Sequence, residues 1–480
     1  NFTPFRETAE DKVWVEAGGT PSVDWNRMFK YMRYYPHSCS EQICSKGLTL
    51  LYALQNLSEE NYGKARDMIP QMIDDLYSRQ RSDGGILYWP GTGKSNEWVS
   101  SMALEFLAAA RAEGFQVAGD VVNALVKYQR NCVNAYKRST GYALDDLAQA
   151  YRLFSLAVSG NADEASMNRL KLGGELSWPA TMMLASAYSA CGKAAVGKEI
   201  IDAFGDNSKE WTPSDMTFGS SLRDNAIMLE ALVRTGDISA AVSHAAEIIR
   251  NYDAAYWNTQ ESFFIAKAFR ELSAKVTKDK IKADASNSKS KSERNGVITW
   301  NIDSSAGMTS VTNNSAGPVF VRFTAVSQPS PDTAVKEASN GGLELNVRYT
   351  GFEDRTVDPA EMVQGDEFTA VITVSNCSAT GNFSNLALAY LIPSGWEIIN
   401  DRLTGTEEND GRYDRLDIRD DRVLLYFDLP MNTYKKFRIR LRAAYEGDYI
   451  LPSASCECMY DRSVNACTAS ERCKVTRLGE

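Results

Sequence analysis

Hydrophobic positions follow three successive patterns along the chain. Residues 12–16 alternate polar and apolar side chains and precede a Gly- and Pro-containing segment at 18–21, which predicts one strand and a turn. From residue 25 to about residue 273, apolar residues rich in Ala, Leu and Met recur with a helical period. After Gly296 the period becomes two, which is typical of strands. The pattern predicts a multidomain α plus β protein.

The helical region contains weak internal repeats, each made of a turn, a polar or aromatic cap, and a helix with small residues on one face. They begin near Leu76, Tyr142, Leu176, Arg223 and Trp257. Paired helices of this kind cannot bury their apolar faces alone and must stack on neighbours. We therefore expect about a dozen helices closed into a ring, an α/α toroid.

Strands should flank this ring. Residues 297–302 and 319–324 alternate, and with the N-terminal strand they would complete a small β domain into which the helices are inserted. Residues 275–294 are rich in Lys, Asp, Ser and Asn, so we interpret them as a solvated connector with room for an edge strand at 276–281.

A second all-β region follows a linker at 329–342. Its expected strands are 343–349, 368–374, 386–391, 423–427, 436–441 and 449–451. About 140 residues with this spacing predict a C-terminal β-sandwich. The predicted domains are 1–22 and 275–335 for the two halves of the small β domain, 23–274 for the toroid, and 336–480 for the sandwich.

Composition excludes several classes of function. The 480 residues carry a net charge of −10, with 44% hydrophobic and 24% charged residues, which is ordinary for a folded protein and unsuited to nucleic acid or an anionic membrane surface. No apolar run approaches the roughly 18 residues that span a bilayer. The chain opens on Asn-Phe-Thr-Pro, so we expect it to be the C-terminal piece of a longer product whose signal or anchor lies upstream.

Cysteine usage does not indicate a metal site. There are nine cysteines, an odd number, so at least one must stay unpaired. Four of them gather near the end, at Cys456, Cys458, Cys467 and Cys473, but their spacing matches no common zinc pattern and the chain has two histidines. We expect a disulfide or packed thiols there, and neither metal nor cofactor.

The stretch with distinctive chemistry is Tyr34 to Ser45, which contains Cys39-Ser40-Glu41-Gln42. Residues three apart share one face of a first helical turn, so the Cys39 thiol and the Gln42 carboxamide can meet there. A thiol held against an amide carbonyl can expel ammonia and leave an internal thioester. Ser38 and Glu41 have capping-box spacing, which predicts Ser38 as the N-cap and Cys39 as the first helical residue, where the helix dipole favours a thiolate.

Simpler interpretations exist for both notable segments of the toroid. Cys39 can be an ordinary buried residue of a capped helix, with Gln42 as a surface helix former. Residues 80–91, which include Gly84-Gly85 and Trp89, can be a turn with a packed Trp. We interpret that second segment as support for the fold more than for a site.

Tyr35-Pro36-x-x-Cys39-x-Glu41-Gln42, followed by the Gly-Gly and Trp segments, resembles the thioester domain of the bacterial alpha-2-macroglobulin family. The resemblance covers almost the whole chain and extends to residues 417–423 and 458–461, which look like the family's terminal macroglobulin-type domain. It names the small β domain CUB-like. Ser38 and Ser40 stand where the family usually has glycine and leucine.

This resemblance implies a covalent protease trap, related to complement thioester proteins, and not an enzyme. In the family a protease cleaves an upstream bait region, and the exposed thioester then acylates the protease. The implied partners are target proteases, through surface lysines, and upstream domains of the same chain. We expect a monomer in the periplasm or cell envelope, held by a lipid-modified N-terminus upstream.

Two alternatives come from other classes. One is an adhesion or scaffold module of the same fold in which Cys39 is inert. The other is an α/α-toroid enzyme, for which the notable acidic pairs are Asp74-Asp75 and Asp145-Asp146; adjacent helical residues do not face each other, which counts against them.

The remaining site predictions concern protection and activation of the thioester. Tyr35 lies four residues before Cys39 and can cover it, and Met459-Tyr460 matches a family segment that docks onto the thioester domain. Complement-type relatives use a toroid histidine to activate hydroxyl nucleophiles. His244 is the candidate here, but its Ala-rich helical setting leads us to expect amines as the preferred nucleophiles.

Overall fold

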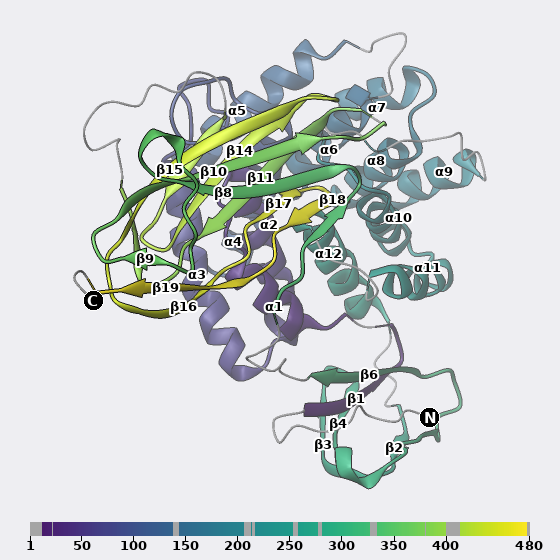
Figure 1. Cartoon of the computed structure of the whole chain (residues 1–480). Helices are drawn as coiled ribbons and strands as arrows, with labels where there is room; N and C mark the ends of the chain where they lie inside the picture. Colours follow the sequence, from purple (N-terminus) through teal and green to yellow (C-terminus); the bar gives the residue numbers. More distant parts are fainter. Residues whose placement is uncertain are drawn as a thin grey trace. The chain divides into compact units, whose positions relative to one another are not determined.

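The computed structural model of the chain describes residues 12–21, 23–137, 144–205, 213, 217–252, 258–276, 281–326, 334–379, 381–399 and 413–477. The chain divides into two compact units, Asn1–Gln328 and Pro329–Glu480. The first unit contains the helices and a small sheet, and the second is all-β (Figure 1).

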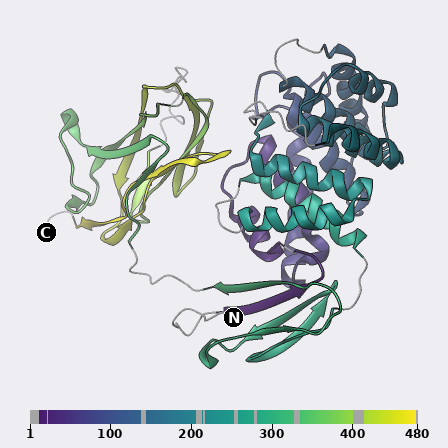
Figure 2. The same cartoon turned by 90° about the vertical axis from the view of Figure 1, so that its right-hand side faces the viewer.

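The helices of the first unit form an inner and an outer set. The inner helices are α2 (Ser40–Ala53), α4 (Glu97–Ala112), α6 (Leu144–Val158), α8 (Trp178–Ala190), α10 (Ser221–Thr235) and α12 (Thr259–Lys275). The outer helices are α1 (Trp25–Tyr34), α3 (Glu59–Tyr77), α5 (Gly119–Ala135), α7 (Glu164–Leu172), α9 (Ala194–Phe204) and α11 (Ile238–Tyr252). Each inner helix packs on the next, and α12 packs back on α2, so the predicted α/α toroid is confirmed (Figure 2).

The residue pattern explains which helices are inner. Helix α8 buries every residue from Pro179 to Tyr188, as expected of a helix that is apolar or small on all sides. Helix α3 instead buries Ala65, Ile69, Met72 and Leu76, a single stripe at helical spacing. Inner helices also approach closely: a Cβ added at Gly47 of α2 would lie 2.4 Å from the ring of Phe106 of α4.

A buried ion cluster lies inside the ring. The Lys267 ammonium of α12 is 2.8 Å from Glu230 of α10 and 3.2 Å from Glu105 of α4, and all three side chains are almost fully buried. Tyr52 and Tyr151 donate hydrogen bonds of 2.9 and 2.7 Å to Glu105. Burial raises the pKa of both phenols, which keeps them protonated donors. Five of the six inner helices thus contribute a charge or a hydroxyl to one cluster.

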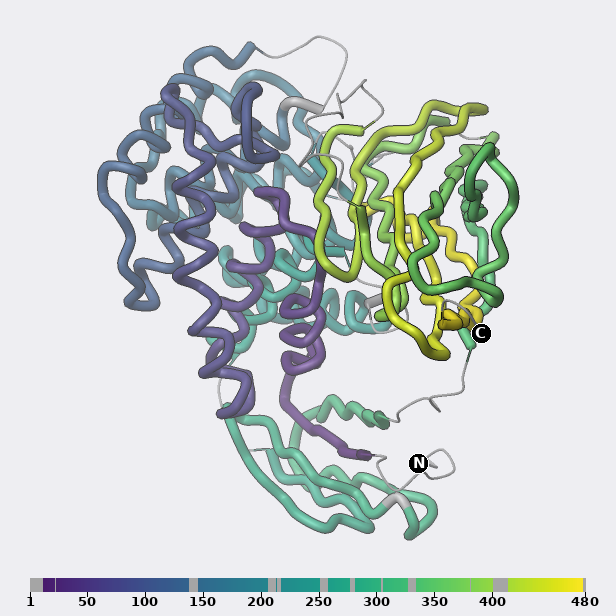
Figure 3. Tube along the Cα trace, turned by 60° about the vertical axis from the view of Figure 1, so that its left-hand side comes forward, coloured from purple at the N-terminus to yellow at the C-terminus, as the bar shows by residue number. Residues whose placement is uncertain are grey.

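The small sheet brings together strands from both sides of the helical region. Its order is β3 (Ser288–Arg294), β4 (Val297–Ile302), β1 (Lys12–Gly18) and β6 (Phe320–Val326). All neighbours are antiparallel, and Val15 pairs with Trp300 on one side and Phe323 on the other. Figure 3 shows the chain leaving β1 for the helices and returning to the same sheet. The helices are therefore inserted in the sheet, as predicted.

The interpretation of residues 275–294 as a connector is wrong in part. Residues Ser288–Arg294 form edge strand β3, and Ala283–Ala285 form β2, which pairs with β5 (Val311–Asn313). Every residue of β3 is exposed, so backbone pairing with β4 holds the strand without a buried face. The edge strand suggested at 276–281 lies largely outside the described residues.

The second unit is a β-sandwich, as predicted. One sheet has the order β12 (Trp396–Ile398), β15 (Tyr434–Ala443), β10 (Glu367–Asn376) and β8 (Leu343–Thr350). The other has the order β13 (Arg415–Ile418), β14 (Arg422–Leu429), β11 (Phe383–Leu391), β17 (Ser455–Cys458), β18 (Asp461–Cys467) and β7 (Ala338–Asn340). A smaller sheet contains β16 (Gly447–Leu451), β19 (Glu471–Thr476) and β9 (Met362–Val363). The six expected strands are present, whereas β7, β9, β12, β13 and β17 to β19 were not predicted.

The late cysteines pack within this sandwich. Cys456 and Cys473 belong to its apolar core, and burial raises the pKa of the Cys473 thiol to about 11. Within the described ranges no group of three or more His, Cys, Asp or Glu side chains could hold a metal ion. Among these same residues no helix is long and apolar enough to cross a membrane.

The ion cluster yields a stability prediction. Replacing Lys267 by Met should lower the free energy of unfolding by about 3–5 kcal/mol, because Glu105 and Glu230 would be left as buried carboxylates without their cation. Urea unfolding followed by helical circular dichroism measures this. Lys198→Met, at an exposed ion pair with Asp202 in α9, is the control and should leave the midpoint nearly unchanged. Equal midpoints for the two variants would contradict the importance of the cluster.

Candidate thioester site

The Cys39 motif lies at the start of α2, but with a different cap from the one predicted. Cys39 itself is the N-cap, in an extended conformation with φ −64° and ψ 168°, and Ser40 is the first helical residue. The prediction of Ser38 as N-cap and Cys39 as first helical residue is therefore wrong. The Ser40 N–H donates to the Tyr88 carbonyl at 2.9 Å, so it points out of α2 as a first-turn N–H must.

Cys39 and Gln42 form a capping box with each other. The Cys39 N–H donates to the Gln42 side-chain Oε1 at 2.9 Å, and the Cys39 side chain faces the Gln42 backbone N–H. Both residues are fully buried. The box that we predicted between Ser38 and Glu41 is thus made one residue later, by the two residues whose side chains would react.

Glu41 joins the first inner helix to the last. Its buried carboxylate accepts hydrogen bonds from the Ser45 hydroxyl at 2.5 Å, the Thr259 hydroxyl at 3.0 Å and the Gln260 amide at 2.8 Å. Thr259 and Gln260 are the first two residues of α12. The amino ends of α2 and α12 therefore lie together, and the positive ends of both helix dipoles favour the Glu41 carboxylate.

The segment after α3 holds the motif from the other side. The Ser40 hydroxyl donates to the Leu87 carbonyl at 2.5 Å. Arg79, which is 7% exposed, donates from Nη1 to the Ser38 carbonyl at 2.9 Å and the Ser40 hydroxyl at 3.2 Å. We interpreted residues 80–91 as support for the fold; the contacts of Leu87 and Tyr88 show that they also fix the backbone of the motif.

Tyr35 and His37 form an aromatic pair just before the motif. Their ring centroids are 5.0 Å apart with the planes nearly perpendicular, and both side chains are buried. Lys46 of α2 donates to the Tyr35 carbonyl at 2.6 Å and to the His37 carbonyl at 3.1 Å. Tyr35 thus lies in an extended conformation at the end of α1, four residues before Cys39, and its shielding role stays a prediction.

Three other predicted residues lie elsewhere in the chain. Met459 and Tyr460 form the turn between β17 and β18, where the Met459 N–H donates to the Asn385 carbonyl at 3.1 Å; their docking onto the toroid stays a prediction. His244 lies in α11, with its Nε2 3.0 Å from the Asn225 carbonyl of α10. Burial lowers the pKa of His244, so it is neutral at pH 7.

Cys44, the cysteine within α2, is not expected to react as a nucleophile. Cys44 is fully buried, and burial followed by the charge of Glu41 raises the pKa of its thiol well above the ordinary value. Arg79 acts in the opposite direction on Cys44. A buried thiol that stays protonated is inert, so Cys44 should not compete with Cys39.

Asp146 and Asp75, one residue from each acidic pair, make structural contacts in the described part of the chain. Asp146 accepts from the N–H and hydroxyl of Ser177, the N-cap of α8, at 2.7 and 2.9 Å. Asp75 accepts from Gln71 one turn earlier on the exposed surface of α3. Neither contact brings two carboxylates together, as general acid and base work requires. These two contacts therefore give the toroid-enzyme alternative no support, and the Asp145 side chain lies outside the described residues.

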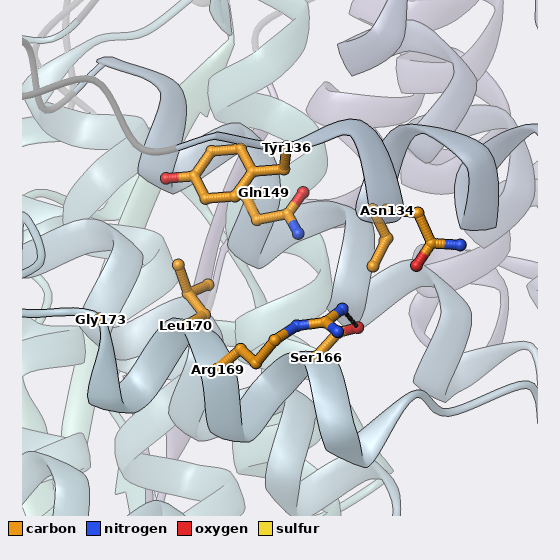
Figure 4. Close-up of a pocket in the computed structure, with 8 residues that line it drawn as sticks. Asn134, Tyr136, Gln149, Ser166, Arg169, Leu170 and Gly173 are labelled. Atoms are coloured by element: carbon orange, nitrogen blue, oxygen red, sulfur yellow. Dashed lines mark hydrogen bonds between the residues drawn. The ribbon is translucent and has the colours of Figure 1, made fainter.

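A cavity of about 370 Å³ lies between α5, α6 and α7, away from the motif. Gln149 and Tyr136 line one wall, and Arg169 on the other wall donates to Ser166 at 2.6 Å (Figure 4). Ser166 in turn donates to Asp163 at 2.8 Å, which caps α7. The polar groups thus serve the helix end, and the lining contains neither a cysteine nor a residue of the motif.

Arg79, Thr259 and Gln260 are site residues that the sequence analysis did not single out. Arg79 is far from Cys39 in the sequence, and an arginine between two helices is by default a surface residue. The only available signal for Thr259 and Gln260 was a polar run opening the apolar helix α12.

Comparisons with known proteins agree with this architecture. Residues 342–462 match the family described as Bacterial Alpha-2-macroglobulin MG10 domain. The alpha-2-macroglobulin homolog of Yersinia pestis is 22% identical to this chain over 94% of its length. The alpha-2-macroglobulin of Escherichia coli K12 is 24% identical over 99% of the chain. The chain covers 25% and 30% of those two proteins.

Two solved structures share the fold. The native Escherichia coli alpha-2-macroglobulin fragment from domain MG7 to the C-terminus has a TM-score of 0.80 at 22% identity, over 97% of this chain and 77% of that one. Salmonella alpha-2-macroglobulin reacted with methylamine has a TM-score of 0.81 at 22% identity, over 98% of this chain and 32% of that one. A helical ring inserted in a sheet and followed by a sandwich is thus the class of structure found in macroglobulins. The chain is thus similar to the C-terminal region of bacterial alpha-2-macroglobulins over almost its whole length, and residues 342–462 match a domain of that family.

The Glu41 contacts yield a prediction for the site's scaffold. Glu41→Gln should lower the free energy of unfolding by about 1–3 kcal/mol, because the new amide would set a donor against donors from Thr259 and Gln260. Thermal and urea unfolding measure the change. Glu60→Gln at the exposed start of α3 is the matched control and should have little effect. A wild-type midpoint in Glu41→Gln would show that the link between α2 and α12 does not stabilise the ring.

Proposed function

We propose that Cys39 and Gln42 form an internal thioester and that this chain is the acylating part of a macroglobulin-type protease trap. The observation that carries the proposal is the hydrogen bond from the Cys39 N–H to Gln42 Oε1, inside a fully buried capping box. Similarity to bacterial alpha-2-macroglobulins supports it; the chain spans 25% and 30% of the length of the two relatives.

Thioester formation fits this geometry. The Cys39 sulfur attacks the Gln42 side-chain carbonyl carbon, the C–N bond of the carboxamide breaks, and the nitrogen leaves as ammonia after taking up the thiol proton. Negative charge develops on Oε1 during the attack. The Cys39 N–H already donates to that oxygen, which is the role of an oxyanion-hole donor.

The product would be a single-use acylating group. An amine attacks the Gln42 carbonyl carbon, the new C–N bond forms, the C–S bond breaks, and Cys39 leaves as a thiolate. Lysine amines of target proteases are the nucleophiles that the family resemblance implies. Because the group is consumed once, the chain acts as a trap and not as an enzyme. Full burial of Cys39 and Gln42 keeps water from hydrolysing the bond before activation.

For the whole protein, the proposal rests on the family resemblance. An upstream bait region would sense the protease, and upstream domains would complete the trap. The same resemblance implies a monomer in the cell envelope, held by a lipid anchor upstream. The adhesion or scaffold alternative predicts the same fold with an inert Cys39, so reactivity at Cys39 separates the two.

Reaction with a small amine is the direct test. The intact mass of the purified chain should be lower than its sequence mass by one ammonia, and methylamine should raise it and release one thiol at Cys39. Salmonella alpha-2-macroglobulin, which shares this fold, has been solved in a form reacted with methylamine, which supports the choice of probe. An intact mass equal to the sequence mass, with no thiol released, would favour the scaffold.

The matched control uses the neighbouring cysteine. Cys39→Ser should restore the full sequence mass and abolish thiol release. Cys44→Ser should change neither, because burial keeps the Cys44 thiol protonated. Release that depends on Cys44 instead would refute the assignment.

A fourth prediction concerns His244. His244→Ala should leave the ratio of methylamine to glycerol incorporation unchanged, because His244 Nε2 is engaged with the Asn225 carbonyl of α10. Mass spectrometry of the Gln42 peptide measures the two adducts. A large loss of the glycerol adduct alone would show that His244 activates hydroxyl nucleophiles.

A further inference from the structure

Arg79 occupies an unusual place beside the motif. It follows the end of α3, yet its side chain is buried and reaches the start of α2. The same nitrogen, Nη1, donates to the Ser38 carbonyl and to the Ser40 hydroxyl. These two groups belong to the residues on either side of Cys39, so the guanidinium contacts the chain both before and after the cysteine.

We propose that Arg79 positions the Cys39 segment and that its charge stabilises the Cys39 thiolate when the thioester opens. This inference rests on the proposed function and adds a residue to it. An arginine is always protonated, and its charge is strongest in a buried site where water screens little. A neutral residue that only held the backbone would not supply this charge.

The charges around the motif make such a cation necessary. Glu41 is a buried carboxylate two residues after Cys39, and its negative charge disfavours a nearby thiolate. Its effect is visible at Cys44, where Glu41 raises the pKa of the thiol and Arg79 lowers it. The titratable and charged side chains on the described elements around Cys39 include Tyr35, His37, Glu41, Cys44, Lys46, Arg79, Tyr88 and Glu105.

The cations of this set have different positions. Lys46 directs its ammonium to the carbonyls of Tyr35 and His37, before the motif. Arg79 contacts the two residues that flank Cys39. Arg79 is therefore the cation placed to offset Glu41 at the reacting sulfur.

The charge matters in one chemical step. When an amine attacks the Gln42 carbonyl carbon, the C–N bond forms, the C–S bond breaks, and the electron pair goes to the Cys39 sulfur. The proton of the attacking amine passes to solvent. A thiolate that is more stable leaves faster, so a cation beside Cys39 should speed aminolysis.

The test compares three variants of the full 480-residue chain. Arg79→Gln keeps a donor for the Ser38 carbonyl but removes the charge, and Arg79→Lys keeps the charge but loses the planar fork. Arg81→Gln, two residues further in the same segment, is the matched control. After methylamine treatment, the pH dependence of iodoacetamide alkylation, mapped to the Cys39 peptide, gives the pKa of the released thiol.

We expect a Cys39 pKa below the ordinary value of about 8.5 in the wild type and in Arg81→Gln. In Arg79→Gln it should rise by about one unit or more, and Arg79→Lys should recover most of this shift. The methylamine reaction of Arg79→Gln should be about threefold to tenfold slower. A wild-type Cys39 pKa at or above the ordinary value, or equal values in Arg79→Gln and Arg79→Lys, would overturn the inference.

Intact mass separates this inference from the proposed function. A wild type without the loss of ammonia refutes the thioester itself. A wild type with the thioester, but with an unchanged Cys39 pKa and methylamine rate in Arg79→Gln, refutes only the role of Arg79. If Arg79→Gln folds without closing its thioester, the pKa of its Cys39 thiol is measured directly and decides the matter in the same way.

Discussion

The buried carboxylate of Glu41 is the interaction on which the candidate site depends. It ties the start of α2 to the start of α12, the first and last inner helices of the ring. A carboxylate removed from water is costly unless hydrogen bonds and positive dipole ends replace the solvent. Ser45, Thr259 and Gln260 provide the hydrogen bonds, and the two helix starts provide the dipoles. The same contacts therefore close the ring and position Cys39.

The same contacts explain why the motif is rigid on all sides. Inner helix α12 fixes Glu41, the segment after α3 fixes Ser38 and Ser40, and the capping box fixes Gln42. A reaction between two side chains of one helical turn requires that their orientation be set in advance. An inert cysteine in a scaffold would not need three independent anchors, and this difference favours the reactive interpretation of Cys39.

The fold could be predicted from the sequence because its signals are local and repeated. Helical periods with Gly and Pro breaks indicate paired helices, and alternation after Gly296 indicates strands. Strand β3 was not predicted because an exposed edge strand needs no apolar residue. Cys39 was predicted one residue too far into α2, as its first residue instead of its N-cap, because Ser38 is the better N-cap by propensity. Arg79 could not be found because its partners are distant in sequence and the tertiary fold alone brings them together.

The insertion of the ring into the sheet has a consequence for how the chain is made. Strand β1 pairs with β4 and β6, whose residues follow the whole ring in the sequence. During synthesis, β1 therefore emerges long before its partner strands, because the twelve described helices are made before β4 and β6. Its buried residues Val13, Val15 and Ala17 are exposed throughout that interval. The strand has only seven residues, and Lys12 and Glu16 are among them. Its short length and charges therefore limit the exposed apolar edge through which a nascent chain could aggregate.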